Sequence, residues 1–372
     1  IIDGRLVRIS TGGSRSVQVI ATGEIPGRTE AVNGQVALVD GAWSDSEADL
    51  RWAAPSPDAL YDELDAFHLP YGEAVGDSTW AEWHYFNVVL DEERWLYLTY
   101  MIGGRVGVPG EWGGQLLLTI RDADGAHRSL TRTFADSLVR LDTTGADVTL
   151  GAENTVRQED GRYRLRAAVE GARLDLVLEP APNRIFPRTE LGSGDLVSGY
   201  VVPALYASVD GEVCLPVRGG VSCERIEAAR AYHDHNWGVW RDVSWEWGAA
   251  SDEEVSLLYG TVYAPGAPDQ GIFAYLVDGD GVLGVFRADS VRVTRWEEGD
   301  GEGGPRRLPA ALSFSDPRRG LEVEIEVLAR HVTDMEREIA PYFVQMRGVA
   351  TVRQSGRADR RLEGFFETYL ER

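Results

Sequence analysis

The chain has 372 residues, enough for two domains that each bury a core. Hydrophobic residues make up 43% of it, as in folded proteins, and no apolar run approaches the roughly 20 residues of a membrane-spanning helix. Acidic residues number 60 against 37 basic ones, and the net charge of -23 repels phosphate backbones, so nucleic acid is not an expected partner. Every basic residue is an arginine, which excludes Schiff-base chemistry and a P-loop lysine.

The first expected helix covers about 57–68, where Ser56 can cap its N-terminus and Leu64 and Phe67 belong to its apolar stripe. We expect it to cover the mouth of a barrel. A second short helix is expected near 334–339.

Alternating polar and apolar residues fill most of the remaining chain and predict half-buried antiparallel strands. In Arg162–Val169 the arginines share one face, and in Leu321–Val327 the glutamates do. Asp-Gly dipeptides, which favour tight hairpin turns, recur along the chain. They are Asp124-Gly125, Asp160-Gly161, Asp210-Gly211, Asp278-Gly279 and Asp280-Gly281. The pattern predicts an all-β fold in sandwich or barrel form.

The two cysteines, Cys214 and Cys223, lie on either side of a predicted turn at Arg218-Gly219. That turn would place them directly opposite each other, within reach of a disulfide. A bridge would indicate an oxidising compartment or a thermophile, whereas two free buried thiols fit the sequence equally well. The chain begins at Ile1 and looks trimmed, so a targeting segment would be out of view, and cytoplasmic and periplasmic locations both stay open.

An aromatic cluster occupies residues 80–86, where polar groups stand among tryptophans. Strand alternation places four side chains on one face: Trp80, Glu82, His84 and Phe86. Trp83 and Tyr85 would then occupy the other face. Glu82 beside His84 is a candidate acid–base pair, and the alternative is an ion pair at a strand end.

The ten residues 231–240 are the strongest functional candidate in the chain. In a strand, one face would carry the carboxyl group of Asp234 between a phenol and an amide, Tyr232 and Asn236. The other face would carry two imidazoles and an indole, from His233, His235 and Trp237. Such a cluster suits acid–base chemistry in an apolar pocket, and the alternative is a satisfied polar cluster inside a β-protein.

Eleven tryptophans are a heavy load for this length. Trp240 is the last residue of the ten-residue stretch, Trp245 and Trp247 follow it closely, and Tyr263 lies a little further along. Aromatic walls supply apolar area and faces that stabilise cations, so we expect them to bind an isoprenoid or polyketide chain, with plain core packing as the alternative.

Two motifs carry a family resemblance. Glu82-Trp-His-Tyr-Phe-Asn87 resembles the Glu-Trp-Trp-Tyr-Phe strand of the hydroxyneurosporene synthase (carotenoid 1,2-hydratase) and AttH-like superfamily, which also includes fungal Diels–Alder enzymes. Asp234-His-Asn-Trp-Gly238 resembles the second motif of that superfamily. The chain departs from the pattern at His84, where tryptophan is common, and at His233, an added imidazole. It also has Tyr263-Ala-Pro where the hydratases carry Tyr-x-Asp.

The resemblance implies two lipocalin-like β-barrel domains, which we place at 1–242, with both motifs, and 243–372. It also implies a site that needs no cofactor and folds or protonates a hydrophobic polyene. Residues carried over from the motifs are Glu82, Trp83, Tyr85, Asp234, His235 and Trp237.

The leading hypothesis is acid catalysis on an isoprenoid-type alkene, by hydration or cyclisation. Candidate catalytic residues are Asp234, His235, His233, Glu82 and Tyr232. Candidate ligand-binding residues are Trp83, His84, Tyr85, Trp237, Asn236, Trp240, Trp245, Trp247 and Tyr263. Asp234 would donate the proton, and His235 or His233 would orient Asp234 or return the proton to it. The tryptophans would stabilise the cation.

Three alternatives accompany this hypothesis. A pericyclase would only fold a polyene, and a carrier would bind a lipid without chemistry. Metal hydrolysis by His233, Asp234, His235 and His84 is disfavoured because neighbouring residues alternate faces. We therefore expect no metal and no cofactor, and a hydrophobic small-molecule partner that a nearby membrane could supply.

Overall fold

The computed structural model describes residues 6–10, 16–20, 65–71, 74–122, 125, 127–193, 196–240, 243–263, 271–301, 304–335 and 341–370. Within these residues the chain is almost entirely β, with one short 3₁₀ helix at Asp136–Leu138, so the expected all-β fold is confirmed. No helix in the described part has the length and apolar character needed to cross a membrane.

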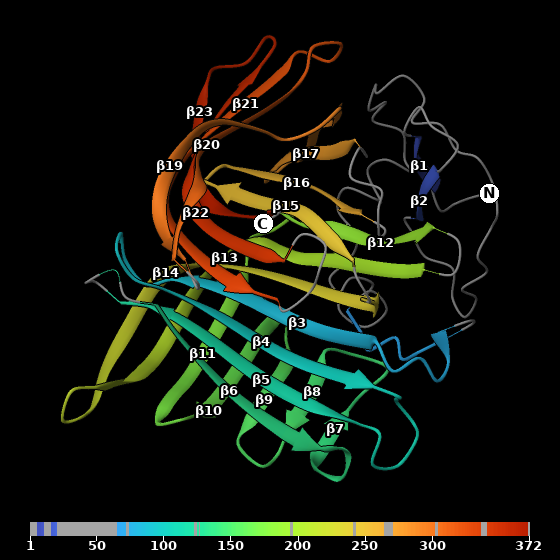
Figure 1. Ribbon diagram of the computed structural model, residues 1–372, viewed down its shortest axis with the longest axis vertical. Helices are drawn as coiled ribbons and strands as arrows, with labels where there is room; N and C mark the ends of the chain where they lie inside the picture. The colour runs from blue at the N-terminus through green and yellow to red at the C-terminus, as the bar shows by residue number, and fades with distance from the viewer. Residues whose placement is uncertain are drawn as a thin grey trace. The chain divides into compact units, whose positions relative to one another are not determined.

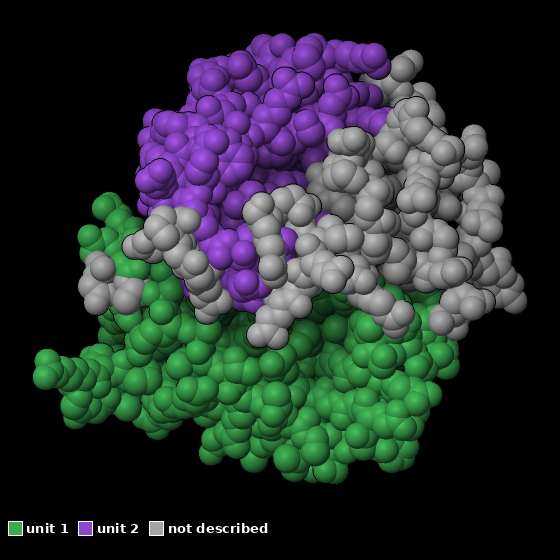
Figure 2. Space-filling view, in the orientation of Figure 1, with its two compact units in different colours: residues 1–6, 19–33, 50–240 green, residues 7–18, 34–49, 241–372 purple. Residues whose placement is uncertain are grey.

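Two compact units divide the chain, and Figure 2 colours them separately. Unit 1 is made mainly of residues 50–240, and unit 2 mainly of residues 241–372. Each unit has its own antiparallel sheet and its own hydrophobic core.

The larger sheet has fourteen strands, and its main path, which lies in unit 1, runs β6-β5-β4-β3-β14-β13-β11-β10-β9-β8-β7 (Figure 1). The strands on this path are β3 (Trp80–Val89), β4 (Trp95–Gly104), β5 (Trp112–Arg121), β6 (His127–Ala135), β7 (Val139–Leu141), β8 (Asp147–Leu150), β9 (Asn154–Glu159), β10 (Arg162–Val169), β11 (Ala172–Pro180), β13 (Leu196–Val217) and β14 (Gly220–Val239). Three further strands pair off the path: β1 (Leu6–Ser10), β2 (Ser16–Ile20) and β12 (Phe186–Ser193).

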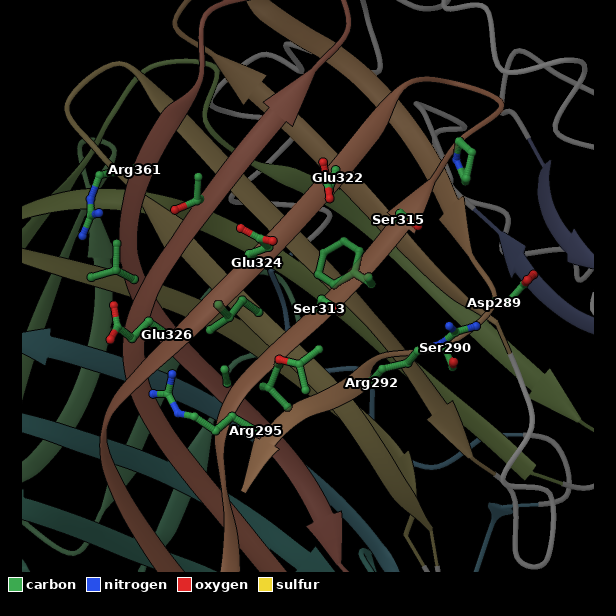
Figure 3. Close-up of a pocket in the computed structure, with 18 residues that line it drawn as sticks. Asp289, Ser290, Arg292, Arg295, Ser313, Ser315, Glu322, Glu324, Glu326 and Arg361 are labelled. Atoms are coloured by element: carbon green, nitrogen blue, oxygen red, sulfur yellow. The ribbon is translucent and has the colours of Figure 1, made fainter. Parts of the chain in front are cut away.

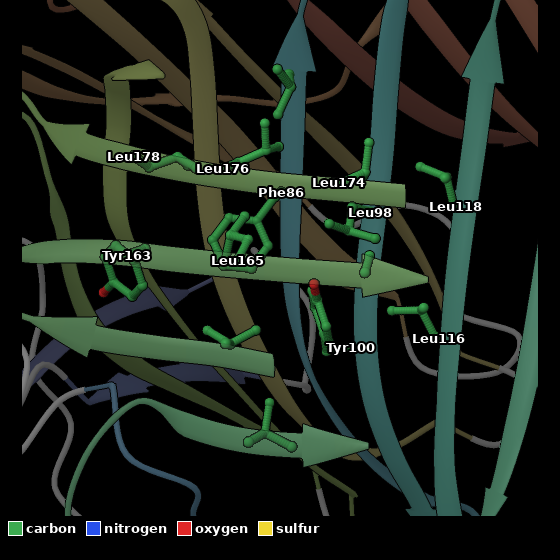
Figure 4. Packing of buried hydrophobic residues seen from close by; sticks show 14 of the residues in the cluster. Phe86, Leu98, Tyr100, Leu116, Leu118, Tyr163, Leu165, Leu174, Leu176 and Leu178 are labelled. Atoms are coloured by element: carbon green, nitrogen blue, oxygen red, sulfur yellow. The ribbon is translucent and has the colours of Figure 1, made fainter. Parts of the chain in front are cut away.

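The two arms of this sheet enclose one core, which makes it a nearly closed barrel. Side chains from β3–β5 meet side chains from β10 and β11 in its interior (Figure 4). The hydroxyl of Tyr100 on β4 donates to the carbonyl of Arg166 on β10 at 2.6 Å, which ties the arms together. The predicted alternation of β10 is confirmed, because Tyr163 and Leu165 are fully buried while the three arginines that alternate with them are exposed.

The hairpin of β13 and β14 contains the predicted turn at Arg218-Gly219. Its register pairs Val217 with Gly220 and Cys214 with Cys223, and the two cysteines form a disulfide.

The Asp-Gly turns have two outcomes. Asp160-Gly161 joins β9 to β10 with positive φ at both residues, as a tight hairpin requires. The hairpin turn predicted at Asp210-Gly211 is wrong, because β13 runs straight through it. Gly211 instead lies at an irregularity in the pairing with β14, and a side chain there would approach the carbonyl oxygen of Asp175 to 2.1 Å.

The sheet of unit 2 has nine strands in the order β18-β17-β16-β15-β23-β22-β21-β20-β19 (Figure 1). They are β15 (Ser244–Ser251), β16 (Val255–Tyr263), β17 (Ile272–Asp278), β18 (Gly281–Ala288), β19 (Arg292–Gly301), β20 (Gly304–Asp316), β21 (Leu321–Asp334), β22 (Tyr342–Gln354) and β23 (Arg360–Leu370). In residues 321–327 of β21 the glutamates are exposed and the leucine, valine and isoleucine side chains are buried, as their alternation predicts.

Both predicted helices fall largely outside the described residues. Of 57–68, only 65–68 are described, and they are not helical. Of 334–339, Asp334 is the last residue of β21 and 336–339 lie outside the described residues.

Candidate functional site

The two sequence motifs lie side by side because β3 and β14 are neighbouring antiparallel strands (Figure 1). Their register pairs His235 with His84 and Asp234 with Tyr85. The predicted groups therefore separate into two sets, one on the interior face of the barrel and one on the opposite face of the same two strands.

The interior face holds a cluster of titratable side chains, here called the interior cluster. It consists of Asp65, His68, Glu82, His84, His233 and His235. Four of the six histidines of the chain belong to it. All members are fully buried except His68, which retains slight exposure.

His235 bridges the two carboxylates of this cluster. Its Nδ1 lies 2.9 Å from Oδ1 of Asp65, and its Nε2 lies 3.1 Å from Oε1 of Glu82. Glu82 is held further by the backbone N–H groups of His68 and Leu69, at 2.6 and 3.1 Å, and by Nδ1 of His68 at 2.9 Å. Glu82 is thus enclosed by short hydrogen bonds on both oxygens.

The contacts of Asp65 with the other two imidazoles are longer. Its Oδ2 lies 3.5 Å from Nε2 of His233, and its Oδ1 lies 3.7 Å from Nδ1 of His84. Nδ1 of His233 lies 3.0 Å from the carbonyl oxygen of Tyr85, and the hydroxyl of Tyr163 donates to Oδ2 of Asp65. Neither ring nitrogen of His84 has a hydrogen-bond partner among the described residues.

These contacts set the charge states of the cluster. Burial alone would lower the pKa of His235, but its hydrogen bonds to Asp65 and Glu82 outweigh burial and raise that pKa to about 9. Burial raises the pKa of Glu82, and the hydrogen bonds from His235 and His68 bring it down to about 2. Burial and the charge of His235 hold the pKa of His84 well below its usual range. Burial also raises the pKa of Asp65, but the surrounding imidazoles outweigh it and hold that pKa well below its usual range.

Aromatic rings enclose the interior cluster. The Trp237 indole stacks on the ring of His68 with centroids 3.5 Å apart, and Phe86 stacks on His233 at 4.1 Å. Phe67 contacts the rings of His84 and His235.

The opposite face carries the arrangement predicted for Tyr232, Asp234 and Asn236. The Tyr232 hydroxyl lies 2.7 Å from Oδ2 of Asp234, and the Asn236 amide donates to Oδ1 at 2.5 Å. Asp234 is only 3% exposed. The predicted position of a carboxyl group between a phenol and an amide is thus present, and we call these three residues the Asp234 triad.

Aromatic side chains flank the Asp234 triad on this face. The ring of Tyr85 contacts the ring of Tyr232, with centroids 6.4 Å apart. Trp83 and Trp240 contact each other at 4.6 Å, and the Trp240 indole N–H donates to the carbonyl of Ala81.

The structure does not join Asp234 to the histidines that were expected to assist it. His233 and His235 point into the barrel interior while Asp234 points to the opposite face, because adjacent residues of a strand alternate. Asp234 therefore cannot exchange a proton directly with either imidazole in this arrangement.

The remaining candidates lie in unit 2. Trp245 donates its indole N–H to Oε2 of Glu367 at 2.9 Å, and Trp247 is buried on the same strand, β15. The side chain of Tyr263 lies outside the described residues.

A polar hollow of about 620 Å³ lies on the sheet of unit 2. Figure 3 shows Glu322, Glu324 and Glu326 of β21 lining it together with Arg292 and Arg295. None of its lining residues was predicted as a site residue from the sequence. Its charged walls do not suit a hydrophobic chain.

Two members of the interior cluster, Asp65 and His68, were not predicted as site residues. Both belong to the segment 57–68, where the apolar positions predict a helix and give no sign of a polar site. The available signal was a histidine and an aspartate flanking the buried Phe67.

No protein-family model and no curated protein matches the chain. Solved structures do match. A putative AttH from Nitrosomonas europaea shares 18% identity with a TM-score of 0.56, covering 82% of this chain and 98% of that one. Kievitone hydratase from Nectria haematococca shares 10% identity with a TM-score of 0.53, covering 83% and 95%. CghA, solved with Sch210972, shares 13% identity with a TM-score of 0.50, covering 87% and 97%. These likenesses support the AttH-like fold expected from the motifs.

Proposed function

We propose that the protein is an enzyme that protonates an alkene of a hydrophobic isoprenoid or polyene, leading to hydration or cyclisation, at the Asp234 triad. The observation that carries the proposal is the nearly buried Asp234 carboxyl group, held between the Tyr232 hydroxyl and the Asn236 amide on a face with aromatic side chains. The likeness to a structure named as a hydratase is consistent with it.

In this mechanism Asp234 carries the proton at the start of the cycle. The Asn236 amide donates to Oδ1 of Asp234, so in this mechanism the acidic proton sits on Oδ2, which lies 2.7 Å from the Tyr232 hydroxyl oxygen. The proton passes to the less substituted alkene carbon, either directly or through the phenol, and a carbocation forms at the neighbouring carbon.

The cation then reacts with water or with a second double bond of the substrate. The faces of Tyr85, Trp83 and Trp240 are suited to stabilise positive charge until it does. When water adds, the oxonium product returns its proton to the Asp234 carboxylate. When a second double bond adds, the cyclic cation loses a proton from a neighbouring carbon to the same carboxylate, so the cycle closes on either route. General acid catalysis of this kind contributes roughly 10²–10⁴-fold to the rate.

The test is a reaction in D₂O with a panel of acyclic prenyl alcohols and carotenoid precursors, followed by mass spectrometry of the products. Protonation places one deuterium on carbon, so hydration or cyclisation by this route yields a product with non-exchangeable deuterium. A pericyclic reaction rearranges the substrate without that label, and a carrier returns the substrate unchanged.

Asp234→Asn is expected to lower turnover by about 10²–10⁴-fold, since it removes the acid and keeps the shape. Asp175→Asn, an exposed aspartate on β11 of the same unit, is the matched control and should retain full turnover. Products without carbon-bound deuterium, or equal turnover by Asp234→Asn, would refute the proposal.

A further inference from the structure

A second site lies in the barrel interior, on the other face of the strands that carry the Asp234 triad. On sequence alone a metal ion is disfavoured there, because Asp234 and the histidines beside it point to opposite faces. The structure removes that objection, since Asp65 supplies a carboxylate on the same side as His84 and His233.

We propose that Asp65, His84 and His233 bind one divalent transition-metal ion of the zinc type. Each residue offers one ligand atom, and the three atoms lie within 4.8 Å of one another. Two imidazoles and one carboxylate form a ligand set that zinc-type ions accept, with a further coordination position left for water.

The separations of these atoms fit a shared ion better than hydrogen bonds. Two donors bound to one zinc ion lie about 3.3–3.5 Å apart, because each metal–ligand bond is about 2.0–2.2 Å long. Oδ2 of Asp65 lies 3.5 Å from Nε2 of His233, and Oδ1 of the same carboxylate lies 3.7 Å from Nδ1 of His84. Both contacts exceed the usual 2.7–3.2 Å of an N–H···O hydrogen bond.

His84 supplies the second, independent observation. It is fully buried, and neither of its ring nitrogens has a hydrogen-bond partner in the described part of the chain. A buried polar group without a partner is costly and uncommon in native proteins. An ion beside Asp65 would satisfy the Nδ1 of His84 directly.

The surroundings of the three ligands match those of metal sites. His233 has its Nδ1 at 3.0 Å from the Tyr85 carbonyl, which fixes Nε2 as the nitrogen that faces Asp65. Asp65 accepts a hydrogen bond from the Tyr163 hydroxyl on Oδ2 and one from His235 on Oδ1, and each oxygen keeps a second lone pair for an ion. Among the described residues, the ion-pair partners of Asp65 are all imidazoles.

The neighbouring group of His68, Glu82 and His235 also has three potential ligands. It is the weaker candidate because the imidazole nitrogens that would bind an ion there already hydrogen-bond to Glu82, at 2.9 Å from Nδ1 of His68 and 3.1 Å from Nε2 of His235. Glu82→Gln therefore distinguishes the two locations.

The test uses the full chain, freed of metal with a chelator and titrated with Co²⁺ and then Zn²⁺. Co²⁺ in a low-symmetry nitrogen and oxygen site gives visible ligand-field absorption, which a merely structural role for these residues would not produce. We expect one equivalent to bind and Zn²⁺ to displace it. His84→Gln and Asp65→Asn should weaken binding at least about 100-fold, and Tyr163→Phe, which keeps all three ligands, by about 10–100-fold.

His127→Gln, a substitution on β6 of the same unit, is the matched control and should bind as the wild type does. Tyr163→Phe keeps the test decisive if the ligand variants fail to fold. The proposal is overturned if the folded wild-type protein takes up no stoichiometric Co²⁺ or Zn²⁺. It is also overturned if Tyr163→Phe and the folded ligand variants bind like the wild type, or if only Glu82→Gln loses binding.

Discussion

Oδ1 of Asp65 lies 2.9 Å from Nδ1 of His235, although the two residues are 170 positions apart in the chain. The contact joins the segment that precedes β3 to the second motif on β14. Because the other nitrogen of His235 lies 3.1 Å from Glu82, one imidazole on β14 links the segment before β3 and β3 itself inside the barrel. Both carboxylates favour the protonated imidazolium, so the link is charged on all three groups.

Asp65→Asn should destabilise the protein by about 3–5 kcal/mol, measured by denaturant unfolding in the presence of a chelator. The substitution removes one charge from a buried pair and leaves the His235 imidazolium with Glu82 as its only carboxylate partner within the cluster. The same change at Asp175, which pairs with Arg166 on the exposed side of β11, should cost less than about 1 kcal/mol. Equal losses in the two variants would show that the Asp65 contact contributes no more than a surface ion pair.

The Asp234 triad was predictable because its geometry is local. Tyr232, Asp234 and Asn236 belong to one strand, and the period of two alone brings their side chains to one face. The pairing of Cys214 with Cys223 across the hairpin was predictable for a similar reason, because a two-residue turn fixes the register of a hairpin.

The role of Asp65 was not predictable from pattern. It reaches the histidines through the closure of the barrel, and no spacing in the chain encodes a contact across 170 residues. The failed turn at Gly211 has a related cause. Glycine in a strand can also allow another backbone to approach closely. Here β11 approaches Gly211 at Asp175, where a Cβ would not fit.

Gly199→Ala should destabilise the protein by about 1–3 kcal/mol and perturb tryptophan fluorescence. A Cβ at Gly199 would lie 2.1–2.4 Å from the ring of Trp237, which is fully buried and stacked on His68. The indole must therefore shift, and its stacking partner with it. Gly145→Ala is the control, since a Cβ there meets nothing within 4 Å. A Gly199→Ala protein as stable as that control would contradict the observed packing.

Removal of the disulfide should lower the free energy of unfolding by about 2–3 kcal/mol, because it frees a loop closed over a separation of nine residues in the unfolded chain. The measurement is thermal unfolding of the Cys214→Ala/Cys223→Ala variant with and without a reductant. Reductant should lower the stability of the wild type toward that of the variant and leave the variant unchanged. A wild type that is indifferent to reductant would mean that the bridge does not restrict the unfolded state.

Glu246 on β15 differs from the other acidic groups because burial raises its pKa to about 8. The Thr368 hydroxyl donates to its Oε1 and opposes that rise, while Oε2 is buried without a hydrogen-bond partner among the described residues. The folded protein therefore retains a proton that the unfolded chain releases near its usual pKa of 4.5.

The sign of the resulting pH dependence follows from that proton. Below about pH 4.5 both states are protonated and Glu246 costs nothing, whereas between 4.5 and 8 only the unfolded state ionises, so rising pH favours unfolding. The slope approaches about 1.4 kcal/mol per pH unit and ends once pH passes the folded pKa. Glu246→Gln should remove this component and make the protein more stable than the wild type at pH 8, measured by urea unfolding from pH 5 to 9. Glu326→Gln, an exposed change on β21, should reproduce the wild-type slope, and a Glu246→Gln curve parallel to the wild type would show that Glu246 is ionised in the folded state.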